Sequence, residues 1–194
     1  MRPSNKFIII ALISTIILII SYISTIKILK FIYPIKYKSV IFEESEKYGL
    51  SPYLIASIIK VESNFNPKAL SKKNAMGLLQ ITESTGKWIA EKLDIKNFNS
   101  EILYVPEINI KMGCWYFDYL MKYYEGNLQL ALAAYNGGQG NVNKWIKEDN
   151  IKDNGFFLKD IPFTETRYYV KKVEKTYSIY KNIYKQRKGM NIIA

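Results

Sequence analysis

Residues 62–81 read Glu-Ser-Asn-Phe-Asn-Pro-Lys-Ala-Leu-Ser-Lys-Lys-Asn-Ala-Met-Gly-Leu-Leu-Gln-Ile, and this stretch begins with a carboxylate that follows an apolar helix face. Ile55, Ile58 and Ile59 precede Glu62 by seven, four and three residues, which places all four on one side of a helix. Burial there raises the pKa of a glutamate, and a glutamate that stays protonated near neutral pH can act as a general acid. The alternative is a glutamate at a helix end that turns toward solvent.

Two further blocks follow in the chain, and all three occur in a recognisable order. They are Ala134-Tyr135-Asn136-Gly137-Gly138 and Glu165-Thr166-Arg167-Tyr168-Tyr169-Val170. Together with residues 62–81 they resemble the signature of the lytic transglycosylases of the soluble-lytic-transglycosylase (SLT) type, and the resemblance extends over roughly residues 39–185. It implies a mostly α, lysozyme-like (goose-type lysozyme/SLT) helical domain that cleaves bacterial peptidoglycan.

The resemblance assigns Glu62 as the single catalytic acid/base. It implies that Glu62 protonates the glycosidic oxygen between N-acetylmuramic acid (MurNAc) and N-acetylglucosamine (GlcNAc), then takes the proton of the muramic C6 hydroxyl, leaving a 1,6-anhydro end. Ordinary glycosidases use two carboxylates, whereas no acidic residue follows Glu62 until Glu83. The alternatives are a hydrolytic muramidase on the same fold and a catalytically silent peptidoglycan-binding module.

Five further residues match substrate-binding positions of the family: Ser71, Gln80, Tyr135, Asn136 and Glu165. The amide of Asn136 can both donate to and accept from an N-acetyl sugar. Each position also has a structural alternative: Ser71 as a loop cap, the Asn-Gly-Gly sequence as a helix stop, and Glu165 as an acid favoured by the helix dipole.

Some residues within the blocks are expected to serve packing or to change specificity. We expect Tyr169 to lie in the core, together with Met76, Leu78 and Ile81. Leu79 stands where the signature commonly has methionine, which is a mild apolar exchange. Residues 82–83, Thr-Glu, replace a frequent Met-Pro, and we expect this change to alter the cleft wall.

The composition excludes several classes of catalysis. The chain has no histidine, which excludes Ser-His-Asp and Cys-His catalysis and the usual His-rich zinc sites. The single cysteine, Cys114, allows no internal disulfide, and its helical spacing with Ile110 and Phe117 predicts a core position. No glycine-rich phosphate loop indicates a nucleotide. The expected chemistry requires no metal or organic cofactor.

The net charge of +11 is carried by the two ends of the chain. Residues 1–38 hold six basic and no acidic residues, residues 39–166 hold 14 basic and 16 acidic, and residues 167–194 hold eight basic and one acidic. This distribution argues against a nucleic-acid partner. It suits anionic lipid headgroups or anionic wall polymers, the alternative being two solvated charged faces.

Residues 7–26 form a run of twenty residues without a charge, which spans about 30 Å as a helix and matches a bilayer core. A cleaved signal peptide is the alternative, but the bulky Tyr22 disfavours a cut after Ser24. We therefore expect a short basic N-terminus (1–6), a transmembrane anchor (7–26), a juxtamembrane stalk (27–38), a catalytic domain (39–185) and a basic/apolar tail (186–194). Because peptidoglycan lies outside the membrane, the resemblance implies a single-pass protein with an extracytoplasmic domain, whose partners are glycan strands and the bilayer.

Helix signals are frequent in the body of the chain and strand signals are few. Capping residues, prolines, glycines and apolar spacing predict a first helix ending at Gly49, a second from 51–52 to Pro67, and others over 84–93, 106–124 and 127–135, with a last one from Thr164. Residues 76–82 are expected to form a short extended or looped segment near the cleft.

Overall fold

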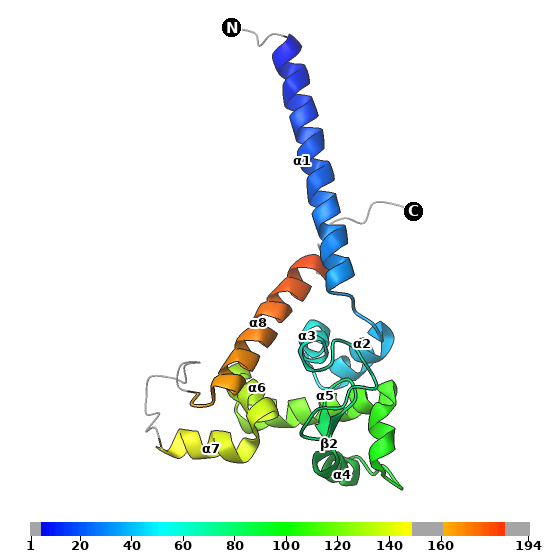
Figure 1. Cartoon of the computed structure of the whole chain (residues 1–194), viewed down its shortest axis with the longest axis vertical. Coiled ribbons are helices and arrows are strands. Elements are labelled where there is room, and N and C mark those ends of the chain that lie inside the picture. The colour runs from blue at the N-terminus through cyan, green and yellow to red at the C-terminus, as the bar shows by residue number, and fades with distance from the viewer. Residues whose placement is uncertain (1–4, 149–160, 185–194) are drawn as a thin grey trace. The chain divides into compact units, whose positions relative to one another are not determined.

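The computed structural model describes residues 5–148 and 161–184, which fold mostly as helices (Figure 1). The predicted tail, 186–194, lies outside the described residues. The elements in chain order are α1 (Asn5–Ile32), α2 (Lys38–Lys47), α3 (Pro52–Glu62), β1 (Ala75–Met76), β2 (Ile81–Thr82), α4 (Glu83–Lys92), the 3-10 helix η1 (Ser100–Tyr104), α5 (Pro106–Tyr123), α6 (Leu128–Gly137), α7 (Gln139–Glu148) and α8 (Thr164–Tyr184).

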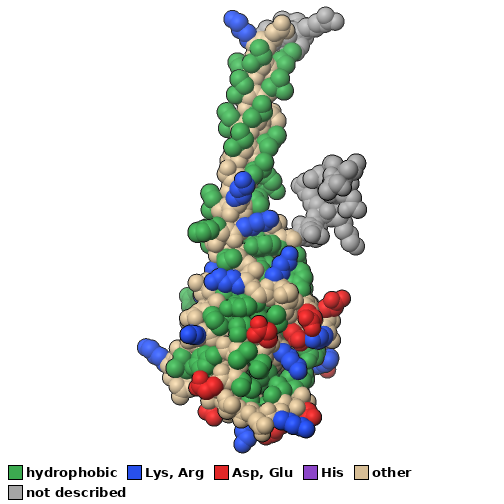
Figure 2. Space-filling view, turned by 90° about the vertical axis from the view of Figure 1, so that its right-hand side faces the viewer, with side chains coloured by type: hydrophobic (Ala, Val, Ile, Leu, Met, Phe, Trp, Pro, Cys, Tyr) green, Lys and Arg blue, Asp and Glu red, His purple; other side chains and the backbone are tan. Residues whose placement is uncertain are grey.

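The chain divides into two compact units, and the first consists of Met1–Ile35 with Asn182–Ala194. Its main element is α1, which is long and apolar enough to cross a membrane by length and composition. None of its residues is buried. Figure 2 shows hydrophobic side chains covering this helix, with Lys or Arg near its two ends. Within the same unit the Tyr184 hydroxyl donates a hydrogen bond to the Tyr33 carbonyl, 2.9 Å away.

The second unit, Lys36–Lys181, is built around α5. This helix packs against α2, α4, α6 and η1, and Figure 1 shows it between the α2–α3 pair and α4. Its inward face is fully buried at Ile110, Cys114, Phe117 and Leu120, which confirms the predicted core position of Cys114. The buried face of α5 therefore forms the centre of the core against which α2, α4, α6 and η1 pack.

The helix ends follow local chemistry. Pro52 occupies the first turn of α3, where its missing N–H costs nothing. The Thr82 hydroxyl accepts a hydrogen bond from the Thr85 N–H and caps α4, and the Asn127 side chain caps α6 by accepting from the Leu130 N–H. The predicted extended segment is also present, as a two-stranded antiparallel pair that aligns Ala75 with Thr82 and Met76 with Ile81.

Three features differ from the expected helices. The second predicted helix was placed up to Pro67, but α3 ends at Glu62, because Asn64 and Phe65 adopt left-handed backbone angles of +52° and +61°. Phe65 thereby enters the core, where it is 2% exposed. The sequence analysis also did not predict η1 and α7. Both follow glycine-containing or polar segments with weak helix signals.

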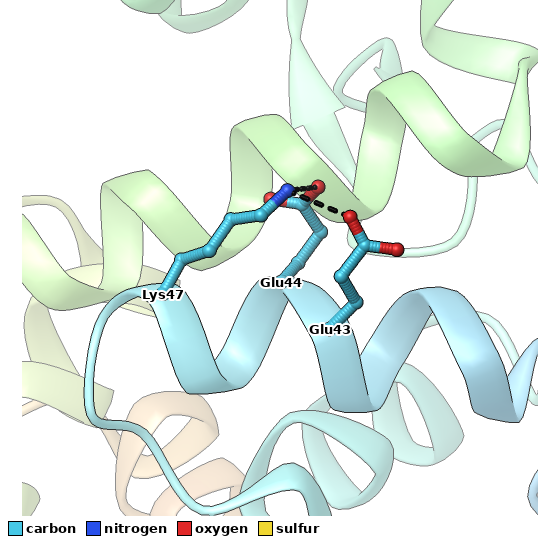
Figure 3. Close-up of polar contacts among 3 residues, drawn as sticks. All are labelled: Glu43, Glu44 and Lys47. Carbon is cyan, nitrogen blue, oxygen red and sulfur yellow. Dashed lines mark hydrogen bonds and ion pairs between the residues drawn. The ribbon is translucent and has the colours of Figure 1, made fainter.

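An ion-pair group fixes the end of α2. Lys47 Nζ lies 2.7 Å from a Glu44 carboxylate oxygen and 3.0 Å from one of Glu43 (Figure 3). The hydrogen bond to Glu44 is the largest cause that raises the pKa of Lys47, followed by that to Glu43. Because Glu44 is buried, Lys47 supplies the counter-charge that its carboxylate requires.

Candidate active site

Glu62 is the last residue of α3, and it follows three fully buried isoleucines of the same helix, Ile55, Ile58 and Ile59. Burial raises the pKa of its carboxyl to about 7, while the nearby hydroxyl of Tyr169 and the charge of Lys172 act in the opposite direction. The residue is half-buried, so one side remains open to solvent. Near neutral pH both protonation states are populated, as a group that first gives and then takes a proton requires.

Two tyrosines accompany Glu62. Tyr169 of α8 is buried, and burial followed by the nearby charge of Glu62 raises its pKa well above the usual value. The pKa of Tyr135 of α6 is also raised well above its usual value, by burial first and then by the charge of Glu62. The Tyr135 hydroxyl donates to the Leu79 carbonyl over 2.7 Å. Both phenols therefore stay neutral, and Tyr169 can donate to the carboxylate.

The loop that follows Glu62 is held by the buried amide of Asn109 on α5. Asn109 Oδ1 accepts from the Leu79 N–H at 2.8 Å, and Nδ2 donates to the carbonyls of Met76 and Leu103 at 3.1 and 2.7 Å. The Ser63 hydroxyl donates to the Leu78 carbonyl at 2.8 Å and links the end of α3 to the same loop. One fully buried side chain thus fixes the backbone of the loop that follows Glu62.

Two glycines allow this close packing. Gly77 has φ +76°, and a Cβ there would collide with the Leu103 carbonyl and the Asn109 side chain. A Cβ at Gly113 of α5 would collide with the Leu79 side chain. The glycine of the Met-Gly-Leu sequence is therefore required by the fold of the loop.

Ser71 and Gln80 lie in this loop, and their side chains bond to its backbone. The Ser71 hydroxyl accepts from the N–H groups of Ala75 and Lys73 at 3.0 and 3.3 Å, which is the loop-cap arrangement. Gln80 Nε2 donates to the carbonyls of Gly77 and Ala69 at 2.9 and 3.2 Å. The Ser71 hydroxyl proton and the Gln80 carbonyl oxygen remain available for a ligand, and contact with sugar stays a prediction for both.

Asn136 and Glu165 occupy different environments. Asn136 is half-buried at the end of α6, and within residues 5–148 and 161–184 its amide makes no hydrogen bond. Glu165 is exposed at the start of α8, where its carboxylate lies 3.8 Å from Lys73 Nζ of the loop. This exposed ion pair brings the third block beside the first, and the roles of Asn136 and Glu165 in sugar binding stay predictions.

The fold joins the three sequence blocks in pairs. Tyr135 bonds to Leu79, which joins the second block to the first. Gly137 packs so closely on Thr166 that a Cβ would lie 3.0 Å from its hydroxyl, which joins the second block to the third. Tyr169 beside Glu62 joins the third block to the first. Blocks separated by many residues in the chain therefore surround one carboxylate.

The sequence analysis missed Tyr169 and Lys172 as site residues. Tyr169 is buried as expected, and among the described residues its hydroxyl has no hydrogen-bond partner, yet it is near enough to Glu62 to lower the pKa of that carboxyl. Lys172 follows it by three positions on the same face of α8. The available signal was a polar atom at a core position, since a buried tyrosine hydroxyl needs a partner.

Among the described residues, no three Cys, Asp or Glu side chains gather where they could hold a metal ion. The groups available around Glu62 are phenol hydroxyls, backbone amides, carboxamides and one lysine. Such groups hydrogen-bond neutral, hydroxyl-rich ligands. The arrangement can therefore exchange a proton with a bound sugar while holding it by hydrogen bonds.

Comparison with known proteins identifies relatives of this unit. The transglycosylase SLT domain family matches residues 39–156. The soluble lytic murein transglycosylase of Salmonella typhimurium is 31% identical over 160 residues, covering 81% of this chain and 25% of that protein. The membrane-bound lytic murein transglycosylase C of Serratia proteamaculans is 31% identical over 174 residues, covering 75% of this chain and 47% of that one. The chain thus spans a quarter to a half of these relatives.

Solved structures give the same result for the fold. The 70 kDa soluble lytic transglycosylase of Escherichia coli aligns with a TM-score of 0.74 and 30% identity, over 79% of this chain and 25% of that one. The lytic transglycosylase Slt of Pseudomonas aeruginosa, solved as an inactive mutant, aligns with a TM-score of 0.71 and 32% identity over the same shares. The lysozyme-like fold expected from the three blocks is therefore confirmed, and the chain belongs to the transglycosylase SLT domain family.

Proposed function

We propose that this protein is a membrane-anchored lytic murein transglycosylase that cleaves the β-1,4 bond between MurNAc and GlcNAc. The observation that carries the proposal is Glu62, whose half-buried carboxyl has a pKa of about 7 beside two neutral tyrosines. The names of the relatives from Salmonella and Serratia support the reaction class.

The reaction follows from the two protonation states of Glu62. The protonated carboxyl gives its proton to the glycosidic oxygen as the bond from that oxygen to muramic C1 breaks, and GlcNAc leaves with a free 4-hydroxyl. The resulting carboxylate takes the proton of the muramic C6 hydroxyl, whose oxygen then bonds to C1. No water is consumed, and Glu62 regains its proton. Tyr169 donates to the carboxylate during this half of the cycle.

The surroundings of Glu62 favour ring closure over hydrolysis. Among residues 5–148 and 161–184, no carboxylate shifts the pKa of Glu62, and the charged group that does so is Lys172. A hydrolytic muramidase of the usual kind places a second carboxylate across the scissile bond. In this site the substrate supplies the nucleophile. The residues proposed to hold the sugars around that position are Ser71, Gln80, Tyr135, Asn136 and Glu165.

The product distinguishes the reaction types. We would digest purified peptidoglycan with the full-length chain in detergent, beside a Glu62→Gln variant, and analyse the released muropeptides by mass before and after borohydride. Non-reducible anhydro ends, absent with the variant, are expected. Reducible ends, heavier by one water, would show a muramidase instead. Binding to the wall without any release would show a catalytically silent module.

The domain boundaries and the position at the membrane belong to the same proposal. Residues 7–26 anchor the chain, residues 27–38 form a stalk, and residues 39–185 form the catalytic domain on the extracytoplasmic side. The apolar helix α1 and the membrane-bound relative from Serratia support anchoring. Mass spectrometry of the chain purified from membranes tests whether the anchor is retained, since a cleaved leader would remove residues 7–26.

A further inference from the structure

Five aromatic side chains form a continuous strip on α4 and α5. They are Trp88 of α4 and Trp115, Tyr116, Tyr119 and Tyr123 of α5, and we name them the aromatic strip. The Trp88 ring centre lies 5.2 Å from that of Trp115, 6.0 Å from Tyr116 and 5.1 Å from Tyr119. Tyr119 continues the strip to Tyr123 at 6.2 Å. Every ring thus contacts another, and no member carries a charge.

The strip is a surface of the unit and is separate from its core. Tyr116, Tyr119 and Tyr123 are spaced by three and four residues, so they share one face of α5. Tyr123 is 48% exposed, and the other four members are half-buried. Phe117, which points to another side of the helix, is fully buried. Aromatic rings that packing alone required would be placed on that second side.

The strip is continuous with the candidate active site. The Tyr116 ring centre lies 5.5 Å from that of Tyr135. Tyr135 bonds to Leu79 of the loop and is close enough to Glu62 for the charge of Glu62 to raise its pKa. From Tyr116 to Tyr123 the strip runs about 10 Å along the helix, at roughly 1.5 Å per residue. It therefore leads away from the catalytic carboxylate along one direction.

Polar groups of α7 border the strip. Asn143 Nδ2 donates to the Tyr123 hydroxyl at 2.8 Å, and its Oδ1 accepts from the Tyr124 hydroxyl at 3.0 Å. Gln139 lies 3.4 Å from the Tyr119 hydroxyl. Rings with neutral amides and hydroxyls at their edges match a sugar, which presents C–H groups on its face and hydroxyls around its rim.

We propose that the aromatic strip binds the peptidoglycan strand on one side of the cleaved bond, with sugar rings lying on Trp88, Trp115, Tyr119 and Tyr123. The proposal rests on the proposed function, since the occupant is the substrate of the same site. The C–H face of a pyranose is slightly positive, and the aromatic face it meets is negative. Continuity with Tyr135 selects a glycan over a protein partner, because the strand that enters the active site must leave it along a neighbouring surface.

The test measures binding without cleavage. The parent is the full-length Glu62→Gln chain in detergent, titrated by calorimetry with stem-free GlcNAc–MurNAc oligomers, a tetrasaccharide and an octasaccharide. Trp88→Leu and Tyr123→Ser are made in that parent, and Tyr123→Ser removes the most exposed ring with the least effect on packing. The matched control is Tyr53→Leu, which removes a half-buried ring that packs edge-on against Phe42, away from the strip.

The parent and the control are expected to bind the octasaccharide more tightly than the tetrasaccharide. Each strip variant should weaken octasaccharide binding about fivefold to tenfold and leave tetrasaccharide binding unchanged, with circular dichroism equal to the parent. Equal octasaccharide affinity in Tyr123→Ser and the parent would overturn the proposal that the aromatic strip binds the glycan strand. That result would not affect the conclusion from the anhydro-product assay. Conversely, reducible products from the wild type would overturn the proposed reaction but not the binding of glycan by the aromatic strip.

Discussion

At the scale of single residues, the proposed chemistry depends on one carboxyl group, Glu62, whose ionisation burial makes less favourable. Burial opposes the charge of Glu62, whereas Tyr169 and Lys172 favour it, and the result is a pKa of about 7. A carboxyl more deeply isolated would hold its proton too firmly to act as a base, and a solvated one would lose it before acting as an acid. The two neighbours therefore adjust the group between its two tasks.

The pH dependence of activity should report this adjustment. In the wild type, kcat/KM is expected to fall as the pH rises through about 7, because the free enzyme must hold the Glu62 proton. Tyr169→Phe removes the hydroxyl that lowers the pKa of Glu62, so the fall in kcat/KM should move to higher pH. The exposed neighbour in Tyr168→Phe serves as the control. If the pH at which kcat/KM falls moved equally in both variants, or in neither, Tyr169 would not be the residue that lowers the pKa of Glu62.

The same carboxyl should affect stability. Its folded pKa of about 7 exceeds the ordinary value of 4.5, so the penalty of its charge is absent below 4.5, grows as the pH rises from there and is complete above about 7. Glu62→Gln is therefore expected to stabilise the chain at about pH 8 by up to roughly 3 kcal/mol, with the difference vanishing near about pH 4. Denaturant unfolding in detergent measures it, with the exposed Glu91→Gln as control. A constant difference across the pH range would count against a buried charge.

At the scale of elements, the site depends on the loop that follows Glu62 and on its attachment to α5. The residues after Glu62 form only short strand and turn structure, and their backbone polar groups need partners outside the loop. Asn109 supplies two of them, for the Leu79 N–H and the Met76 carbonyl, and it also donates to the Leu103 carbonyl of η1. The loop is thus attached to α5, which packs against α2, α4, α6 and η1.

Removing this attachment should be costly. Asn109→Ala leaves the Leu79 N–H and the carbonyls of Met76 and Leu103 without their partner in a buried region, and we expect a loss of about 3 kcal/mol of unfolding free energy. Asn99→Ala, at an exposed position whose side chain makes no cap hydrogen bond, should change stability by less than about 0.5 kcal/mol. Similar unfolding curves for the two variants would show that the loop does not depend on Asn109.

The helical elements were largely predictable because their signals are local. Prolines and capping side chains mark the starts of α3, α4, α5 and α6, and glycines follow α2 and α5. The end of α3 was predicted wrongly because Pro67 was taken as its stop. The left-handed turn at Asn64 and Phe65 ends the helix earlier, driven by burial of the Phe65 ring. A tertiary contact decided that boundary.

At the scale of the whole molecule, the chain combines an apolar helix with a helical catalytic unit. Each unit has its own solvent requirement: α1 exposes large apolar side chains such as Phe7 and Ile10, whereas the second unit encloses its apolar residues. Exposed apolar area of this extent favours a lipid environment. The proposed position, anchored in the membrane with the second unit outside, is consistent with both requirements.

Thiol labelling can test the side of the membrane. Lys92→Cys places a thiol at an exposed position of α4, and a membrane-impermeant maleimide should label it in intact cells if the unit is extracytoplasmic. The wild type is its own control, since Cys114 is fully buried and burial raises the pKa of its thiol to about 12. Labelling of Lys92→Cys only after the cells are opened would place the unit inside.

The amino-acid sequence by itself determined the class of protein. Helix signals, the uncharged run 7–26, the absence of histidine and the three ordered blocks depend on residue identity and short-range spacing, which can be seen in the chain. The tertiary structure decided which side chains surround Glu62. Tyr169 was predicted as core and Lys172 was not considered, because whether a buried hydroxyl or an ammonium faces a carboxylate depends on how α8 packs against α3. The pKa of about 7 has the same origin, since desolvation is a property of packed surroundings that no local pattern contains.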